Sequence, residues 1–344
     1  MLLKKFIELC KTEQVFPPRK IVVAVSGGAD SLALADLLHR SQRLFKLELC
    51  IAHFEHGLRG QASLDDAAFV KSFAENLGVE FYCESGDVQN FAAAEKISVE
   101  LAARQLRYEF LSRVRLQKNF DAIALAHHAD DQAETILMRL LRGSGVTGIS
   151  AMQFCANSPH GLLIRPLLRF RKCELENYCR ARNITPRIDA TNFDAIATRN
   201  KIRLELLPAL EEFNPAITET LCRFAEISAA ESDFISAETE KIYSTVVARN
   251  VFPPGIMFDV PRDAIVREEF LKLPLAIQRA VIRRFIAEQT GSIKDFGFAN
   301  IEAVRKVLLN NLAGTQLPNH FKARQISGIL SIEKDFWYRK EWSL

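Results

Sequence analysis

Residues 21–31 read Ile-Val-Val-Ala-Val-Ser-Gly-Gly-Ala-Asp-Ser, a stretch in which an apolar run is followed by two glycines. Its apolar first half predicts a buried strand, and the helical periodicity from Ser31 onward predicts a helix directly after the glycines. Glycine lets the backbone turn tightly and approach an anion closely, while the first turn of a helix offers unpaired N–H groups. The stretch therefore predicts a phosphate-binding loop, with a simple N-capped turn as the alternative.

The same alternation of short apolar runs and helical segments continues along the first two-thirds of the chain. Repeated strand–helix–strand units imply parallel strands with right-handed crossovers, so we expect an α/β, doubly wound parallel sheet. Strands are expected at Lys20–Val25, Leu47–Ala52, Val79–Cys83, Asp121–Ala126 and Leu162–Ile164, with helices near Ser31–Arg40, Ser63–Leu77, Ser98–Arg115 and Asp130–Leu141.

The alternation stops near residue 212, where long helical segments begin. We therefore expect a catalytic domain at residues 1–212 and a smaller, mainly helical C-terminal domain at residues 213–344.

The composition is that of a globular enzyme, with 48% apolar and 25% charged residues and a net charge of +3. No apolar run approaches the roughly 20 residues that span a bilayer, and charges follow the first residues too soon for a signal peptide. The seven cysteines are scattered without a Cys-x-x-Cys pair, which argues against disulfides and a structural zinc site. We expect a cytoplasmic protein that does not bind membranes.

Polar segments follow three of the predicted strands, at the edge where an α/β sheet binds its ligand. Asp30 lies in the first, where an acid beside phosphates indicates a bridging Mg²⁺ or a structural partner. His127, Asp131 and Glu134 follow the fourth strand and share one helical face. They could hold Mg²⁺, or bind an amine substrate and help to remove its proton; acids that complement the helix dipole are the alternative.

The consecutive residues Ser-Gly-Gly-x-Asp-Ser at 26–31 resemble the PP-loop of the N-type ATP pyrophosphatases, which have an adenine nucleotide alpha hydrolase-like fold and adenylate a substrate carbonyl. With the segments 53–60, 127–145 and 189–203, the chain resembles the tRNA(Ile)-lysidine synthetase family from Ile21 to about Pro208, and more weakly over Phe258–Asn310. That family adenylates carbon 2 of the wobble cytidine in the CAU anticodon of tRNA(Ile). The ε-amino group of L-lysine then displaces AMP.

The resemblance implies ATP and Mg²⁺ as cofactors, with the metal at Asp30. It implies ATP contacts at Ser26, Gly27, Gly28, Ala29, Asp30, Ser31 and His56, and catalytic roles for Asp30, His127, Asp131, Glu134 and Arg199.

Basic residues suggest where tRNA binds. Residues 161–205 hold ten Lys and Arg against five Asp and Glu, which suits a polyanion, although a solvated helical face gives the same pattern. The tRNA contacts we expect are Arg104, Arg107, Arg203 and Arg283, with surface ion pairing as the alternative for the first two. Trp337–Trp342 could stack on RNA or close a small core. We expect Gly314–Leu344 to be a remnant of a further domain that many family members carry, and a homodimer is left open.

Three other functions compete with this one. A tRNA thiolase of the same superfamily would bring paired cysteines, which are missing here. An amidating synthetase would need an ammonia source or a glutaminase domain. A non-catalytic nucleotide-binding or RNA-binding regulator would bind ATP without releasing pyrophosphate.

Overall fold

The computed structural model describes residues 1–57, 61–187, 198–251 and 262–334. The chain divides into two compact units, Met1–Ala229 and Ala230–Leu344. The long helix α11 (Ile217–Val246) begins in the first unit and ends in the second. The predicted boundary between residues 212 and 213 falls at the end of α10 (Leu207–Phe213) and stays a prediction.

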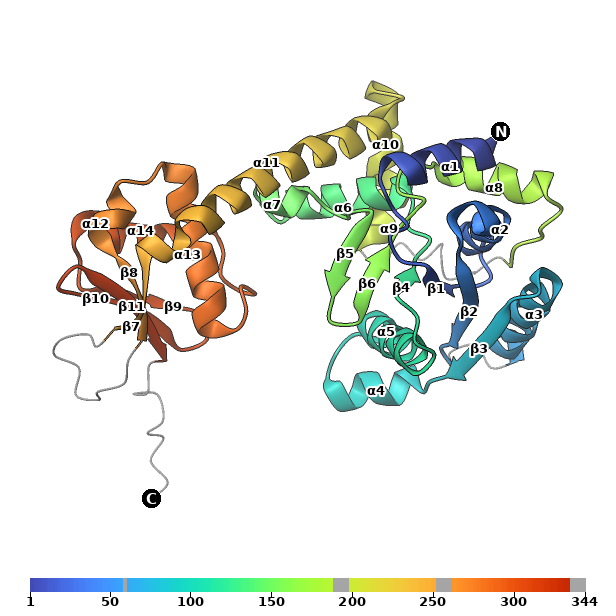
Figure 1. Cartoon of the computed structure of the whole chain (residues 1–344), viewed down its shortest axis with the longest axis horizontal. Helices are drawn as coiled ribbons and strands as arrows, with labels where there is room; N and C mark the ends of the chain where they lie inside the picture. Colours follow the sequence, from blue (N-terminus) through green and yellow to red (C-terminus); the bar gives the residue numbers. More distant parts are fainter. Residues whose placement is uncertain (58–60, 188–197, 252–261, 335–344) are drawn as a thin grey trace, which may run out of the picture. The chain divides into compact units, whose positions relative to one another are not determined.

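The first unit is built on a six-stranded sheet in the order β3-β2-β1-β4-β6-β5 (Figure 1). Every neighbouring pair is parallel except β5 and β6. The predicted parallel sheet is therefore confirmed, with an antiparallel edge strand that the sequence did not indicate. The strands are β1 (Lys20–Ala24), β2 (Glu48–Glu55), β3 (Glu80–Ser85), β4 (Ala122–Ala124), β5 (Cys155–Ser158) and β6 (Gly161–Ile164).

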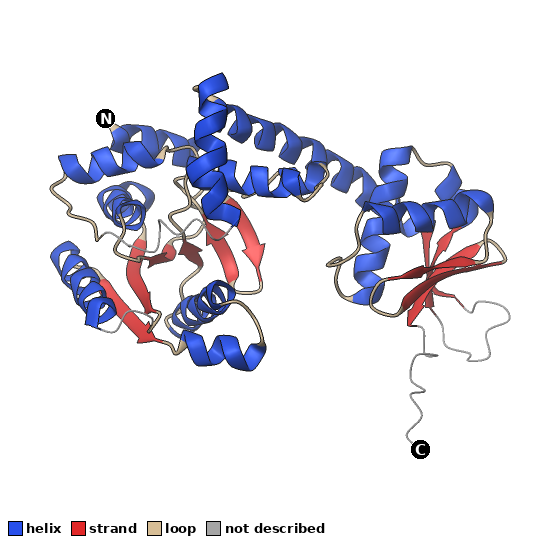
Figure 2. Cartoon of the chain, turned by 180° about the vertical axis from the view of Figure 1, so that it is seen from behind, coloured by secondary structure: helices blue, strands red, loops and turns tan. Residues whose placement is uncertain are grey.

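Helices cover both faces of this sheet, as Figure 2 shows from behind. Ile21 and Val23 of β1 pack into the core under α1, α2, α3 and α8, whereas Val22 packs into the core under α4 and α5. Successive side chains of a strand point to opposite faces, so an unbroken apolar run is what a doubly covered strand requires. The helices are α1 (Leu2–Thr12), α2 (Ala29–Phe45), α3 (Gln61–Leu77), α4 (Val88–Glu95), α5 (Val99–Gln117) and α8 (Lys172–Ala181).

A separate small core joins the remaining helices of the first unit. Ala133, Ile136 and Leu137 of α6 pack there against Ile202 and Leu207. The helices are α6 (Ala129–Leu141), α7 (Val146–Ile149), α9 (Thr198–Lys201), the π-helical turn η2 (Ile202–Leu206), α10, and the first part of α11.

The strand order places a switch point beside β1. The chain goes from β1 to β2 and β3 on one side, then returns to β4 on the other side of β1. The loops that leave the carboxyl ends of β1 and β4 therefore diverge and open a crevice, which is where open α/β sheets bind ligands.

The second unit contains a five-stranded antiparallel sheet in the order β7-β8-β11-β10-β9. Our expectation of a mainly helical domain is wrong, because its strands are only four to six residues long and easily missed between helices. Gly314–Lys334 supplies three of the five strands and so belongs to this sheet rather than to a remnant of another domain. The elements are β7 (Val247–Val251), β8 (Arg262–Val266), α12 (Arg267–Leu271), α13 (Leu275–Thr290), α14 (Phe298–Asn310), β9 (Gly314–Leu317), β10 (Phe321–Ile326) and β11 (Ile329–Lys334).

None of the helices in the described ranges has the length and apolar character needed to cross a membrane.

The second unit has its own hydrophobic core, in which Phe285 of α13 is fully buried. We predict that Phe285→Ala lowers the free energy of unfolding of this unit by about 3–5 kcal/mol, because it leaves a cavity. Urea unfolding followed by circular dichroism measures the change. Phe298→Ala is the matched control, because Phe298 is 66% exposed. An equal loss in both variants would contradict the assigned core.

Candidate functional site

The phosphate-loop prediction corresponds to a tight turn between β1 and α2. Val25 extends β1 by donating its N–H to the Ala52 carbonyl at 3.0 Å, and the buried His53 donates Nδ1–H to the Val25 carbonyl at 2.8 Å. Gly27 then has φ +95°, a conformation that side chains disfavour, and Gly28 precedes the first turn of α2. No side chain caps this helix, so its first N–H groups stay available to an anion.

The Ser31 hydroxyl organises the turn from inside. It donates to the Gly28 carbonyl at 2.9 Å and accepts the Ser26 N–H at 3.1 Å, and the two serine hydroxyls lie 3.3 Å apart. The loop is thus pre-formed by its own side chains, which lowers the entropy that a phosphate must remove on binding.

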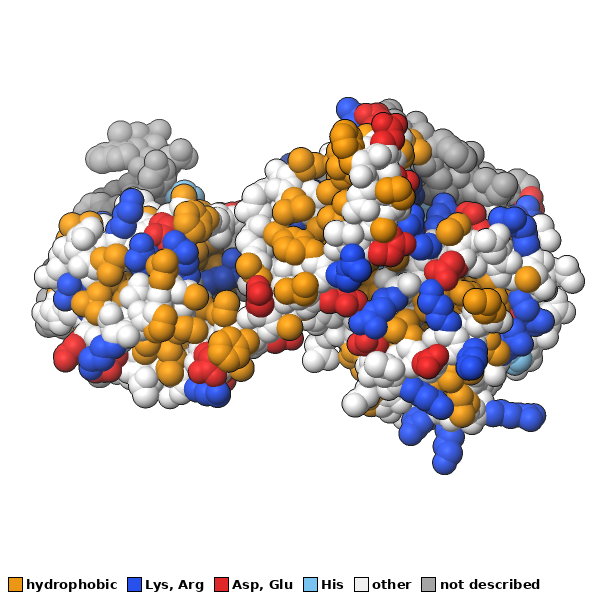
Figure 3. Space-filling view, turned by 90° about the horizontal axis from the view of Figure 1, so that it is seen from above, with side chains coloured by type: hydrophobic (Ala, Val, Ile, Leu, Met, Phe, Trp, Pro, Cys, Tyr) orange, Lys and Arg blue, Asp and Glu red, His pale blue; other side chains and the backbone are white. Residues whose placement is uncertain are grey.

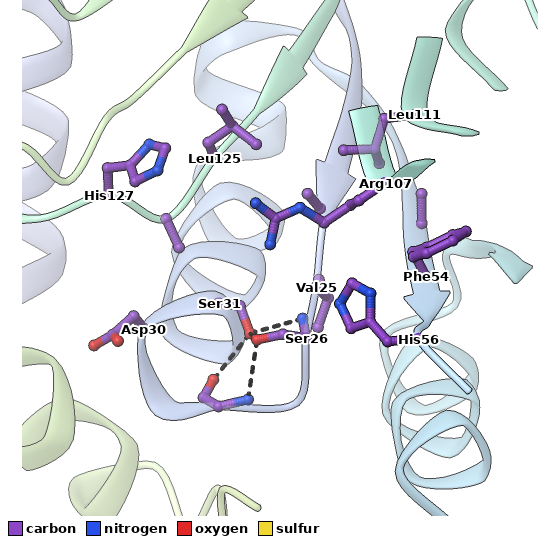
Figure 4. A pocket seen from close by; sticks show the side chains of 14 residues that line it. Val25, Ser26, Asp30, Ser31, Phe54, His56, Arg107, Leu111, Leu125 and His127 are labelled. Carbon is purple, nitrogen blue, oxygen red and sulfur yellow. Dashed lines mark hydrogen bonds between the residues drawn. The ribbon is translucent and has the colours of Figure 1, made fainter. Parts of the chain in front are cut away.

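A pocket of about 210 Å³ opens above the loop, at the carboxyl ends of β1, β2 and β4 (Figure 4). The loop forms one wall, and α5 contributes Arg107 and Leu111 to another. Besides the serines and glycine of the loop, four residues that the sequence singled out line this pocket: Asp30, His56, Arg107 and His127. The lining is Ala24, Val25, Ser26, Gly28, Asp30, Ser31, Ala52, Phe54, His56, Arg107, Leu111, Leu125, Ala126 and His127.

His127 enters this pocket as a neutral imidazole. Burial lowers its pKa to about 3, and although Asp131 acts in the opposite direction, the guanidinium groups of Arg165, Arg107 and Arg199 lower it further. Its Nδ1 is buried, and none of the residues that the structure describes forms a hydrogen bond with it. At neutral pH His127 can therefore orient a substrate group, but it is too weakly basic to hold a proton.

His128 lies among three carboxylates where β4 joins α6. Its Nε2 is 3.6 Å from Asp30 and 3.4 Å from Asp131, and its Nδ1 is 3.4 Å from Asp130. Burial lowers the pKa of His128, but hydrogen bonds and charge from these carboxylates outweigh burial and raise it to about 10. A charged imidazole therefore connects the phosphate loop to the first turn of α6. The sequence offered a signal in the adjacent His127-His128 pair, but His128 was not among the predicted site residues.

Asp131 and Glu134 are bound by two arginines, Arg199 on α9 and Arg203 on η2. Arg199 donates Nε to Glu134 at 2.7 Å and Nη2 to Asp131 at 2.9 Å, and Arg203 donates Nε and Nη2 to Glu134 at 2.5 and 3.1 Å. The Glu134 side chain is 1% exposed, whereas that of Asp131 is 14% exposed. Both oxygens of Glu134 are thus used by arginines, and Asp131 is the more accessible acid.

Arg171 connects the same site to the helices behind it. Its guanidinium donates to Asp130 at 3.0 Å, to Glu219 at 3.0 Å and to Glu211 at 3.1 Å. Asp130 also accepts the Lys172 N–H at 2.8 Å. Because Arg171 lies far from Asp130 in sequence, no spacing rule could have predicted this contact.

One oxygen of Asp30 fits a cation. Its Oδ1 is buried and has no hydrogen-bond partner among the described residues, next to the loop that would hold phosphates. Mg²⁺ commonly binds to one or two carboxylates together with substrate phosphates. In the part of the chain that the structure describes, no cluster of three His, Cys, Asp or Glu side chains forms a site that would hold a metal without substrate.

Two predicted tRNA contacts are not among the residues that line the pocket. Arg104 is exposed on α5, with its guanidinium 4.9 Å from the Tyr108 ring centroid. Arg283 is exposed on α13 in the second unit. The segments Asp189–Asn192 and Trp337–Trp342, also singled out in the sequence, lie outside the described residues.

Known proteins resemble this chain in sequence over most of its length. The family model for the PP-loop domain matches residues 2–210. The tRNA(Ile)-lysidine synthase of Clostridium perfringens is 34% identical over 303 residues, covering 88% of this chain and 62% of that protein. The tRNA(Ile)-lysidine synthase of Geobacter sulfurreducens is 38% identical over 297 residues, covering 86% of this chain and 60% of that protein. The chain thus spans about three fifths of the length of these curated relatives.

A solved structure shares the fold at lower identity. The U34-tRNA thiolase of Methanococcus maripaludis, with its [4Fe-4S] cluster, superposes with a TM-score of 0.54 and 19% identity. The match covers 65% of this chain and 77% of the thiolase.

We predict that His127→Gln reduces the loss of stability in acid. Because the folded pKa of His127 is depressed, the unfolded chain takes up its proton first as the pH falls below about 6.5, and the folded state is destabilised down to about pH 3. Glutamine cannot take up this proton. Between pH 7 and pH 5 the free energy of unfolding of the variant should therefore fall by about 1–2 kcal/mol less than that of the wild type. Urea unfolding at both pH values measures it, with His39→Gln as control; an identical loss in wild type and His127→Gln would contradict the neutral imidazole.

Proposed function

The chain belongs to the PP-loop domain family, and we propose that it is a tRNA(Ile)-lysidine synthase, which joins L-lysine to the wobble cytidine of tRNA(Ile) with a CAU anticodon, using ATP. The observation that carries the proposal is the meeting of a pre-formed phosphate loop and an acidic cluster at one edge of the sheet. The first can hold a nucleotide and the second can hold an amine.

The nucleotide is proposed to bind along the pocket with its terminal phosphates on the loop. The free N–H groups of α2 and the hydroxyls of Ser26 and Ser31 face that end, and Asp30 would hold Mg²⁺ through its unpartnered oxygen. The metal would neutralise part of the phosphate charge. Apolar side chains such as Phe54 and Leu111 offer the remaining surface to adenosine.

The reaction needs activation because a ring carbonyl is a poor electrophile. In the proposed first step, the O2 oxygen of the cytidine attacks the α-phosphorus, an O–P bond forms, and pyrophosphate leaves with the electron pair of the broken bond. Carbon 2 then carries AMP as a good leaving group. In the second step the ε-nitrogen of lysine, having lost a proton, bonds to carbon 2 and AMP departs with the oxygen.

Asp131 is our choice for the residue that binds the lysine ammonium. Both acids already accept hydrogen bonds: Glu134 accepts from Arg199 and Arg203, and Asp131 accepts from Arg199 and from the His128 N–H. Asp131 is nevertheless partly exposed whereas Glu134 is buried, and Asp131 lies close enough to His127 to affect its pKa. Lysine is largely protonated at neutral pH, so the Asp131 carboxylate can first bind the ammonium. It can then accept one proton from the ammonium, which leaves a free amine to attack carbon 2. Glu134 would position the two arginines rather than touch lysine.

The tRNA is proposed to bind partly through charge. Figure 3 shows Lys and Arg side chains gathered over the first unit on the face drawn, which suits a polyanion. Arg104 and Arg283 remain proposed tRNA contacts, because both are exposed. Arg203 instead binds Glu134, and we assign it to the acidic cluster. The cytoplasm is the expected compartment.

The chemistry of the pocket argues against a thiolase. All seven cysteines lie in the described ranges, and none of them lines the pocket. Cys10, Cys50 and Cys179 are buried, and burial raises the pKa of each thiol, which disfavours the reactive thiolate. Sulfur transfer through a cysteine of this pocket is therefore not supported.

The proposal is tested by incubating the protein with labelled lysine, ATP and either tRNA(Ile) with a CAU anticodon or tRNA(Met), which has the same anticodon. We predict that label enters only tRNA(Ile) and that AMP and pyrophosphate appear in equal amounts. Clean ATP binding without lysine transfer would instead identify a non-catalytic regulator.

We further predict that Asp131→Asn lowers lysine transfer at least about 100-fold, because the amide cannot bind an ammonium or accept its proton. The midpoint of thermal unfolding should change little, since the amide keeps the shape of the carboxylate. Glu75→Gln, a variant of an exposed acid on α3, is the control with normal transfer. A fully active Asp131→Asn protein would disprove the assignment.

A further inference from the structure

Arg171 binds three acids that come from three different helices. It directly precedes α8, and its Nε, Nη1 and Nη2 atoms donate to Asp130 of α6, Glu219 of α11 and Glu211 of α10. Each guanidinium nitrogen thus has its own carboxylate, and the three directions are fixed because the group is planar. All four residues belong to the first unit, so one side chain connects the start of α11 to the start of α6.

Asp130 continues this connection into the acidic cluster of the site. Its Oδ1 accepts from Arg171 at 3.0 Å, its Oδ2 accepts the Lys172 N–H at 2.8 Å, and Oδ2 also lies 3.4 Å from His128 Nδ1. The other ring nitrogen of His128 lies 3.4 Å from Asp131. Arg171 does not line the pocket, yet it holds the carboxylate that precedes the proposed lysine-binding acid in the chain.

Arg169, two residues earlier, binds the same long helix in a different way. It donates Nε to Glu226 of α11 at 2.8 Å and pairs with Glu13, just after α1, at 2.9 Å. These bonds go to acids outside α6. Arg169 therefore fastens α11 as Arg171 does, but its bonds do not reach the first turn of α6. The two arginines form a matched pair in which Arg171 alone bonds to Asp130.

The attack of lysine depends on position, because misplacing a bound group by about 1 Å can slow its reaction about 100-fold. Asp131 follows Asp130 in the first turn of α6, so a turn that shifts when Asp130 is released carries Asp131 with it. The phosphate loop should shift less, since its own serine hydroxyls fix it from inside and its contact with His128, at 3.6 Å, is longer.

We propose that Arg171 is a positioning residue for the attack of lysine. It uses the acids of α10 and α11 as fixed points from which it holds Asp130, and through Asp130 the first turn of α6 with Asp131. This inference rests on the lysine-binding role proposed above for Asp131.

The first test measures the two proposed steps separately. tRNA(Ile) is adenylated with ATP labelled at the α-phosphate while lysine is omitted, and the release of labelled AMP is then timed after saturating lysine is added. We expect Arg171→Gln to slow this release about 10- to 30-fold and to slow adenylation less than about threefold. Arg169→Gln should keep both rates within about twofold of the wild type.

A merely structural role of Arg171 gives a different pattern. Equal slowing of both steps, equal slowing in the Arg171 and Arg169 variants, or an unchanged release of AMP would each overturn the proposal. Arg171→Lys keeps the charge but cannot direct three fixed donors at three acids, so we expect it to release AMP at less than about a third of the wild-type rate. A wild-type rate in this variant would overturn the proposal as well.

Amide hydrogen exchange tests the same link without the reaction. The Gln132 N–H donates to the His128 carbonyl at 3.1 Å and closes the first turn of α6. We expect this amide to exchange at least about 10-fold faster in Arg171→Gln than in the wild type, because the turn opens more often, and to be unchanged in Arg169→Gln. The same exchange rate in the wild type and Arg171→Gln would contradict the proposal.

A second variant keeps the test decisive if Arg171→Gln does not fold. The double variant Glu211→Gln, Glu219→Gln changes two half-exposed acids and leaves Arg171 bonded to Asp130 alone. We expect it to release AMP at least about threefold more slowly, and a wild-type rate would overturn the proposal. If the wild type does not adenylate tRNA(Ile), the proposed function fails, whereas the exchange of Gln132 still decides whether Arg171 holds the turn.

Discussion

The structure of the site depends on charge pairing at the first turn of α6. Carboxylates on the loop and on α6 meet an equal number of cations there, from the N-terminal ends of α6 and α8, from α9 and from η2. Each partner alone would be expensive to bury, and together they fix the loop against α6. The carboxylates are Asp30, Asp130, Asp131 and Glu134, and the cations are His128, Arg171, Arg199 and Arg203.

The switch point beside β1 makes this pairing possible. Because the chain leaves β1 toward β2 on one side and leaves β4 toward β6 on the other, the loops at the carboxyl ends of β1 and β4 leave room for a ligand between them. The nucleotide end of the crevice carries unpaired donors and the guanidinium of Arg107, whereas the neighbouring end carries acids. Opposite charges within one crevice suit a reaction that joins an amine to a site activated by a phosphate anhydride.

Much of the first unit follows from local patterns in the sequence. The apolar run before Ser26 and the glycines after it predict the strand, the turn and the helix, and the spacing of Asp131 and Glu134 predicts their shared face. Contacts between distant segments could not be read in this way. His128 pairs with Asp30, which lies nearly a hundred residues earlier in the chain. Arg107 was predicted to contact tRNA, because helical periodicity does not reveal whether a residue faces a pocket. The second sheet was missed because short antiparallel strands give a weak signal beside long helices.

In the proposed reaction, ATP reacts at its α-phosphorus in this pocket and leaves AMP on the RNA before lysine attacks. The most direct measurement incubates the wild-type protein with tRNA(Ile) and ATP labelled at either the α- or the γ-phosphate, with lysine omitted. We predict that only the α-label becomes bound to tRNA, and that added lysine releases it as AMP. Transfer of the γ-label, or no transfer of either label while ATP is bound, would contradict it.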